Sequence, residues 1–106
     1  MSYQALSKIL KILADPSRLE ILDILSCGEL CACDLLAHFD FSQPTLSYHM
    51  KALVDNELVF TRKSGNKRLY RLNRALLEAV NANINFIHTA HERCICHDII
   101  SGECGA

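Results

Sequence analysis

Two short helical segments joined by a tight turn, followed at once by a pair of β-prone runs, constrain the fold of this chain most strongly. The helical segments fall within about 31–55, and Ser42 can cap the second, so this stretch has the helix-turn-helix pattern. The β-prone runs 58–62 and 68–72 flank a basic Lys-Ser-Gly-Asn-Lys segment. They predict a hairpin, or wing, over about 58–72.

Three further helices are expected around this unit, because apolar residues recur at helical spacing over about 3–13, 16–27 and 74–92. Asp15 suits the N-cap and Pro16 the first turn of the middle one. The first and last helices offer more apolar surface than a small domain needs. The sequence therefore predicts a mainly α fold with a small β-hairpin, a winged helix-turn-helix whose N- and C-terminal helices form a dimer interface. The alternative is that both helices cover the core of a monomer.

Size and composition fit a single domain. The chain has 106 residues, 50% hydrophobic and 22% charged, and a core of this size can fold without disulfides. We expect one domain over 1–106, with a cysteine-bearing tail at 93–106. Lys8 and Lys11 interrupt the first apolar run, and no stretch approaches the roughly 18 apolar residues of a membrane span. A cytoplasmic protein with no membrane partner is expected, and its six cysteines are predicted to be reduced thiols used for ligation or sensing.

Charge is distributed unevenly. The net charge is −1, yet residues 41–77 carry seven Lys and Arg against two Asp and Glu. A local basic surface on an otherwise acidic protein favours a polyanionic partner, because salt screens charges beyond about 10 Å. A solvated basic face without a partner is the alternative.

Three motifs carry a family resemblance: ADPSRLEIL at 14–22, ELCACDL at 29–35 and SQPTLSYHM at 42–50. Together they resemble the ArsR/SmtB family of metal-responsive winged-helix repressors, and most of all its arsenical-resistance operon repressors. The resemblance implies a homodimer, without enzymatic activity or a permanent cofactor, that represses its operon. It also implies release from double-stranded operator DNA when a thiophilic metalloid ion binds. A twofold dimer predicts that this operator is an inverted repeat.

The second helix of the helix-turn-helix carries the candidate DNA contacts. A helix in the major groove must present donors and acceptors to base edges, and Gln43 can pair with adenine. Basic residues at the wing tip suit phosphates or the minor groove. His49 is either a histidine at the edge of the core or a further contact. The predicted contacts are Gln43, Thr45, Ser47, Tyr48, Lys51, Lys63, Lys67 and Arg68.

Cys31 and Cys33 are the candidate metalloid ligands. Inside an ideal helix at about 100° per residue, side chains two positions apart point about 200° apart and cannot share an ion. Placing Cys31 at the N-cap and Cys33 just inside the helix removes this conflict. The positive end of the helix then lowers the pKa of the thiols toward the thiolates that bind soft ions.

The resemblance implies that trivalent arsenic or antimony takes three thiolates, and Leu36 stands where one family arrangement has its third cysteine. The candidates for the third ligand are Cys27, Cys94, Cys96 and Cys104. The tail cysteines could instead form a separate site. A zinc site on the last helix is not expected, because His88, His91 and Glu92 lack the upstream Asp-x-His partner and amides stand there.

Other functions remain open on the sequence alone. The repressor could sense thiol oxidation or persulfides, or cadmium, lead or zinc, in place of arsenic. A thiol redox enzyme is disfavoured because the chain lacks a Cys-x-x-Cys motif and a βαβ pattern. A winged-helix protein-interaction module would show no salt-dependent DNA binding.

Overall fold

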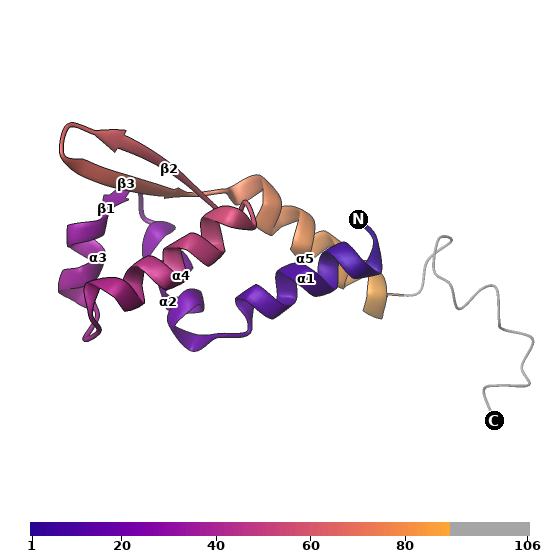
Figure 1. Ribbon diagram of the computed structural model, residues 1–106. Coiled ribbons are helices and arrows are strands. Elements are labelled where there is room, and N and C mark those ends of the chain that lie inside the picture. Colours follow the sequence, from indigo (N-terminus) through magenta and orange to yellow (C-terminus); the bar gives the residue numbers. More distant parts are fainter. Residues whose placement is uncertain (90–106) are drawn as a thin grey trace, which may run out of the picture.

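The computed structural model describes residues 1–89 of the chain. The elements in order are α1 (Tyr3–Leu13), α2 (Pro16–Leu25), β1 (Leu30–Cys31), α3 (Ala32–His38), α4 (Gln43–Asp55), β2 (Val59–Ser64), β3 (Lys67–Leu72) and α5 (Arg74–His88). Figure 1 shows the β2–β3 hairpin beside α3 and α4, while α1 and α5 extend toward the opposite end of the molecule. The predicted mainly helical fold with a winged helix-turn-helix is confirmed. Among the helices described, none has the length and apolar character needed to cross a membrane.

Polar caps set where the helices begin. Asp15 accepts a hydrogen bond from the Arg18 backbone N–H at 3.1 Å, and Ser42 does the same for Thr45 at 3.4 Å, as expected for N-caps. Helix α2 ends at Leu25, two residues earlier than predicted, and Gly28 then adopts a φ of 147° in the turn that leads to β1. Helix α5 is described to His88, so the predicted extension to 92 and the tail at 93–106 lie outside the described residues.

The sheet has one strand more than the predicted hairpin. It is antiparallel with the order β1-β3-β2. Leu30 pairs with Tyr70 and Cys31 with Leu69, while Gly65 turns the hairpin with a φ of 62°. A strand of two residues is too short to show a period in the sequence. The result is that Cys31 is joined directly to the wing.

The core lies between α2, α3, α4 and the base of the wing. Its buried residues are Ile21, Leu22, Leu25, Leu35, Leu46, Met50, Leu53, Leu58 and Val59. At the edge of this core, Arg18 donates from Nε to Nδ1 of His49 at 3.2 Å and from Nη1 to the carbonyl oxygen of Ile12 at 3.3 Å. His49 is only 8% exposed. It therefore lies at the edge of the core, the first of its two predicted placements.

The α1 and α5 helices are covered only in part. Leu6 and Val80 are buried within one chain, and Leu76 is partly buried against its core. Farther along α5, Ile84 is 37% and Ile87 57% exposed. The start of the predicted dimer stripe thus packs within its own chain, and only its end faces solvent.

Candidate functional site

One face of helix α4 packs in the core, and the other faces solvent. Leu46, Met50 and Leu53 are buried against the other helices. The predicted DNA contacts on this helix are all exposed: Gln43, Thr45, Ser47, Tyr48 and Lys51. The helix therefore presents a polar face of the kind that can enter a DNA groove.

Three of these exposed side chains have partners within the chain, and one of them is Thr45, whose hydroxyl oxygen lies 3.1 Å from that of Ser42. The Tyr48 ring lies 5.4 Å from the guanidinium carbon of Arg18, a cation–π contact that links it to the core edge. The ammonium of Lys51 lies 2.8 Å from a carboxylate oxygen of Asp55, and this hydrogen bond raises the pKa of Lys51. A DNA phosphate at Lys51 has to compete with Asp55.

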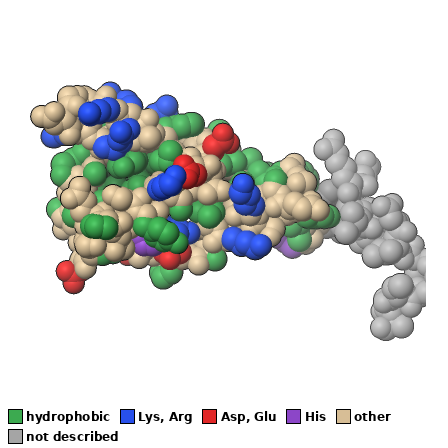
Figure 2. Space-filling model, viewed as in Figure 1, with side chains coloured by type: hydrophobic (Ala, Val, Ile, Leu, Met, Phe, Trp, Pro, Cys, Tyr) green, Lys and Arg blue, Asp and Glu red, His purple; other side chains and the backbone are tan. Residues whose placement is uncertain are grey.

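The wing tip carries the remaining predicted contacts. Lys63 pairs with Arg68 and Ser64 with Lys67 across the hairpin, and all three basic side chains are exposed. Figure 2 shows Lys and Arg side chains gathered over the wing. Within residues 1–89 none of the three forms an ion pair. The tip is therefore a cationic surface available to phosphates.

Two other arginines of the wing have side-chain partners, and one of them, Arg62, joins the wing to the rest of the fold. Arg62 donates from Nε and Nη2 to the two carboxylate oxygens of Glu29, at 2.9 and 2.7 Å. The hydrogen bond from Arg62 lowers the pKa of Glu29. On the same hairpin, Arg71 stacks 4.4 Å from the centroid of the Phe60 ring. Glu29 lies two residues before Cys31. This bidentate ion pair therefore attaches the segment that precedes the cysteine motif to β2.

Cys31 is the N-cap residue of α3, as predicted. Its backbone is extended, with φ −85° and ψ 162°, and its Sγ accepts the Asp34 backbone N–H at 3.3 Å. In return, the Asp34 carboxylate accepts the Cys31 N–H at 3.1 Å, which completes a capping box. The same carboxylate oxygen lies 3.1 Å from Cys31 Sγ.

The sulfurs of Cys31 and Cys33 are joined in a disulfide, so the prediction of reduced thiols is wrong for this pair. The extended backbone at the N-cap removes the divergence of about 200° that a regular helix would impose, and the two sulfurs meet. Cys31 is buried and Cys33 exposed. Cys27, in the turn after α2, is an exposed free cysteine.

Asp34 is a candidate ligand that sequence reasoning missed. The ligand atoms of Cys31, Cys33 and Asp34 lie within 4.8 Å of one another, and Cys27 is not part of this group in the described residues. The only signal in the sequence is that Asp34 directly follows Cys33, and this position alone does not mark it as a ligand. Cys94, Cys96 and Cys104 lie outside the described residues, as do His91 and Glu92.

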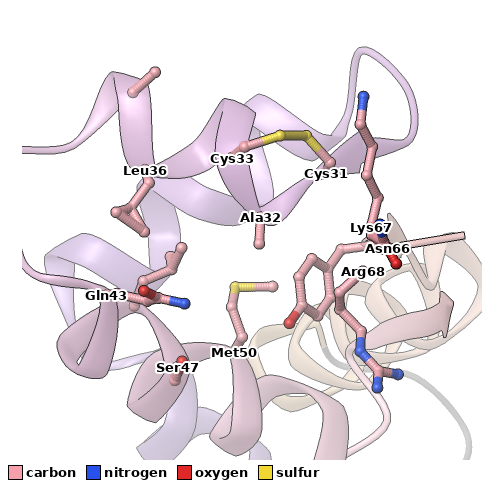
Figure 3. A pocket seen from close by; sticks show the side chains of 13 residues that line it. Cys31, Ala32, Cys33, Leu36, Gln43, Ser47, Met50, Asn66, Lys67 and Arg68 are labelled. Carbon is pink, nitrogen blue, oxygen red and sulfur yellow. A yellow bond between two sulfur atoms is a disulfide. The ribbon is translucent and has the colours of Figure 1, made fainter. Parts of the chain in front are cut away.

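A hollow of about 680 Å³ connects the cysteines with the predicted DNA contacts. Its walls come from α3, α4 and the wing: Cys31, Ala32, Cys33, Leu36, Ala37, Gln43, Leu46, Ser47, Met50, Asn66, Lys67, Arg68 and Tyr70. Figure 3 shows the disulfide at its rim, with Ala32 and Met50 directed into it from opposite sides. Four predicted DNA contacts, Gln43, Ser47, Lys67 and Arg68, thus share one surface with the cysteine pair.

Known proteins resemble this chain over almost its whole length. The arsenical resistance operon repressor of Staphylococcus aureus is 67% identical over 104 residues, which cover 98% of this chain and 100% of that protein. The chain belongs to the arsR family. The arsenical resistance operon repressor of Staphylococcus xylosus is 66% identical over the same share of both chains. The family model described as "Bacterial regulatory protein, arsR family" matches residues 15–60 of this arsR-family chain, from the α2 cap into β2.

A solved structure agrees with the fold. An ArsR family transcriptional regulator superposes with a TM-score of 0.72 at 30% identity, covering 79% of this chain and 87% of that one. The Staphylococcus relatives are named as repressors and not as enzymes, so the expectation that this arsR-family chain is not an enzyme is confirmed.

Proposed function

We propose that this chain is a homodimeric repressor of an arsenical-resistance operon, and that trivalent arsenic or antimony releases it from operator DNA by binding the thiolates of Cys31 and Cys33. One observation carries the proposal. The cysteine pair and four predicted DNA contacts line the same hollow, in a chain 67% identical to a repressor of arsenical resistance. A metalloid ion bound by the cysteine pair would therefore lie next to side chains that are proposed to contact DNA.

DNA binding is assigned to α4 and the wing tip. Gln43, Thr45, Ser47 and Tyr48 present donors and acceptors toward base edges, while Lys51, Lys63, Lys67 and Arg68 face phosphates. The exposed apolar ends of α1 and α5 form the homodimer contact. A twofold dimer then reads two half-sites of an inverted repeat, about one helical turn or a multiple of it apart.

Ligation requires the reduced pair. A small thiol reductant opens the disulfide, is itself oxidised to a disulfide, and leaves two cysteine thiols. Arsenous acid then exchanges hydroxyls for sulfur: each S–As bond replaces one As–O bond, the thiol proton leaves in water, and arsenic stays trivalent. The third position falls to Cys27, Cys94, Cys96 or Cys104, to the Asp34 carboxylate, or to a retained hydroxyl.

Coupling to DNA follows from where Cys31 stands. It caps α3, which packs against α4, and it pairs with Leu69 of the wing. A metalloid ion that shifts the position of Cys31 would therefore also shift α4 and the wing, the two elements proposed to contact DNA. Loosening DNA tenfold to a hundredfold requires only about 1.4–3 kcal/mol of coupling, which must be reciprocal.

The test is release of an operator fragment by arsenite, with the protein kept reduced. Cys31→Ser and Cys33→Ser should each retain operator binding and lose the response, because hydroxyls keep the size and capping ability of thiols but not their affinity for soft ions. Cys27→Ser tests the third position: a retained response excludes Cys27 as the third ligand, and a lost response assigns it. The proposal is wrong if the Cys31/Cys33 double serine variant releases operator at the same arsenite concentration as the wild type.

The disulfide itself favours a second candidate, a repressor that senses thiol oxidation through the same pair. This candidate requires that oxidation alone changes operator affinity. Operator titrations of the oxidised and reduced protein without arsenite decide it, since equal affinities exclude redox sensing by this pair.

A further inference from the structure

Arg18 places a buried cation at the start of α2. Its side chain is 9% exposed, and within residues 1–89 it forms no ion pair with a carboxylate. Its hydrogen bonds go to neutral acceptors, Nδ1 of His49 and the carbonyl oxygen of Ile12. Burying a charge costs free energy, and an apolar side chain would fill the edge of a core without that cost. Core packing alone therefore does not account for an arginine at this position.

The contacts of Arg18 fix its guanidinium between three helices. Ile12 lies in the last turn of α1, where carbonyl groups lack a partner within the helix. Arg18 lies in the first turn of α2, and His49 lies on α4. The His49 ring is itself flanked by the rings of Phe41 and Tyr48, whose centroids are 5.7 and 5.6 Å away. The acceptor that receives the Arg18 Nε–H is therefore held in one orientation.

The fixed guanidinium faces the ring of Tyr48. The guanidinium carbon lies 5.4 Å from the ring centroid, which is within cation–π range. The Tyr48 side chain is 65% exposed, and it is one of the predicted DNA contacts on α4. Ordering a free side chain at an interface weakens binding by about three- to tenfold. A tyrosine that Arg18 already orders avoids this loss.

We propose that Arg18 is a positioning residue for DNA reading, which holds the Tyr48 ring in the orientation that contacts operator bases. The inference rests on the proposed function, because it requires that α4 reads the DNA. Ile12 and His49 fix the guanidinium, the guanidinium orders the tyrosine, and the tyrosine contacts the DNA. Arg18 is buried and makes no phosphate contact of its own. Because these contacts begin at α1, they also join the proposed dimer end to the DNA-reading helix.

Arg18→Lys separates positioning from charge. Lysine keeps the positive charge but lacks the planar fork that donates to two acceptors and stacks on a ring. The operator affinity of the reduced full-length protein should fall about three- to tenfold. Its affinity for a duplex of unrelated sequence and its salt dependence should not change, because no phosphate contact is lost. Arg74→Lys, the same change at an exposed arginine of α5, is the matched control and should leave operator affinity unchanged.

A map of base discrimination provides a readout that a purely structural role would not change. Operator fragments with single base-pair changes are titrated with the wild type, Arg18→Lys and Tyr48→Leu. Arg18→Lys should relax discrimination at the base pairs where Tyr48→Leu relaxes it, and at no others. In the Tyr48→Leu background, Arg18→Lys should cause no further loss of operator affinity, because the side chain through which it acts is gone.

Two substitutions of His49 test the acceptor, and they decide the question if Arg18→Lys does not fold. His49→Asn places an amide oxygen near the position of Nδ1, so it should keep the operator affinity of the wild type. His49→Leu removes the acceptor from a side chain of similar size and should weaken operator binding as much as Arg18→Lys does. Denaturant unfolding of each variant establishes that the affinities belong to folded protein.

The outcomes separate the positioning role from the proposed function. If the wild type prefers operator, and Arg18→Lys and His49→Leu bind it as tightly as the wild type does, the positioning role is wrong and the proposed function stands. A loss spread equally over all base pairs, or losses that multiply in the double variant with Tyr48→Leu, also overturns the positioning role. A reduced wild-type protein without preference for operator overturns both.

Discussion

The two ends of this molecule differ in how completely their apolar side chains are buried within one chain. At the end formed by α3, α4 and the wing, apolar side chains are buried and the segment before Cys31 is held by the Glu29–Arg62 pair. At the other end, α1 and α5 leave Leu10, Ile84 and Ile87 exposed. The first end is complete in a single chain, and the second leaves exposed the apolar side chains that the proposed dimer would bury. Under the proposed function, DNA contact and metalloid ligation therefore lie at one end of the fold and assembly at the other.

The largest effect is expected in the core beneath the cysteine pair. Leu35 is fully buried on α3, so Leu35→Ala should lower the free energy of unfolding by about 2–5 kcal/mol. Denaturant unfolding of the reduced protein measures it. A cost below about 1 kcal/mol would show that α3 is not packed as a rigid support for the site.

A charge on the exposed part of α5 should leave the fold of one chain intact and prevent formation of the proposed dimer. Ile84→Asp puts a charge on the exposed part of α5, where it costs little within one chain and much at an apolar contact. Sedimentation should show a monomer, and operator affinity should fall at least about tenfold, or 1.4 kcal/mol, because a monomer reads only one half-site. Leu19→Asp, at an exposed leucine of α2, is the control. A wild-type protein that is monomeric at micromolar concentration contradicts the proposed dimer.

The wing contributes through charge. Lys63→Ala with Lys67→Ala should reduce the slope of log affinity against log salt by about 0.9 for each phosphate that the variant no longer neutralises. Lys8→Ala with Lys11→Ala, on α1 at the assembly end, is the matched pair. An unchanged slope for the wing variant removes the tip from the DNA interface.

Much of this architecture follows from local sequence, and the site does so only in part. Asp15 and Ser42 act on their own helices, so their capping roles could be predicted from neighbouring residues. By contrast, the pairing of Cys31 with Leu69 depends on tertiary structure. The N-cap position of Cys31 was predictable because its geometry is local. The disulfide, the hollow and Asp34 as a donor were not, since the sequence pattern fixes neither oxidation state nor the space between α3, α4 and the wing.

The smallest effect concerns the link between Glu29 and Arg62. The pKa of Glu29 is lowered in the folded state, so its contribution to stability is present above the ordinary glutamate pKa and disappears as the pH falls through the lowered value. Glu29→Gln should remove this part of the acid dependence and change stability little near pH 7, because the pair is exposed. Denaturant midpoints from about pH 3 to 7 test it, with Glu78→Gln, at an exposed position of α5, as control. Identical pH profiles for Glu29→Gln and wild type would contradict the assignment.

Reciprocal binding tests the coupling between the cysteine pair and the DNA surface most directly. The affinity of the reduced wild-type protein for arsenite is measured with and without saturating operator, and operator affinity with and without saturating arsenite. Coupling through Cys31 predicts that each ligand weakens the other by the same factor, about tenfold to a hundredfold, and that the factor falls to one in the Cys31/Cys33 double serine variant. An arsenite affinity that operator leaves unchanged would contradict the account.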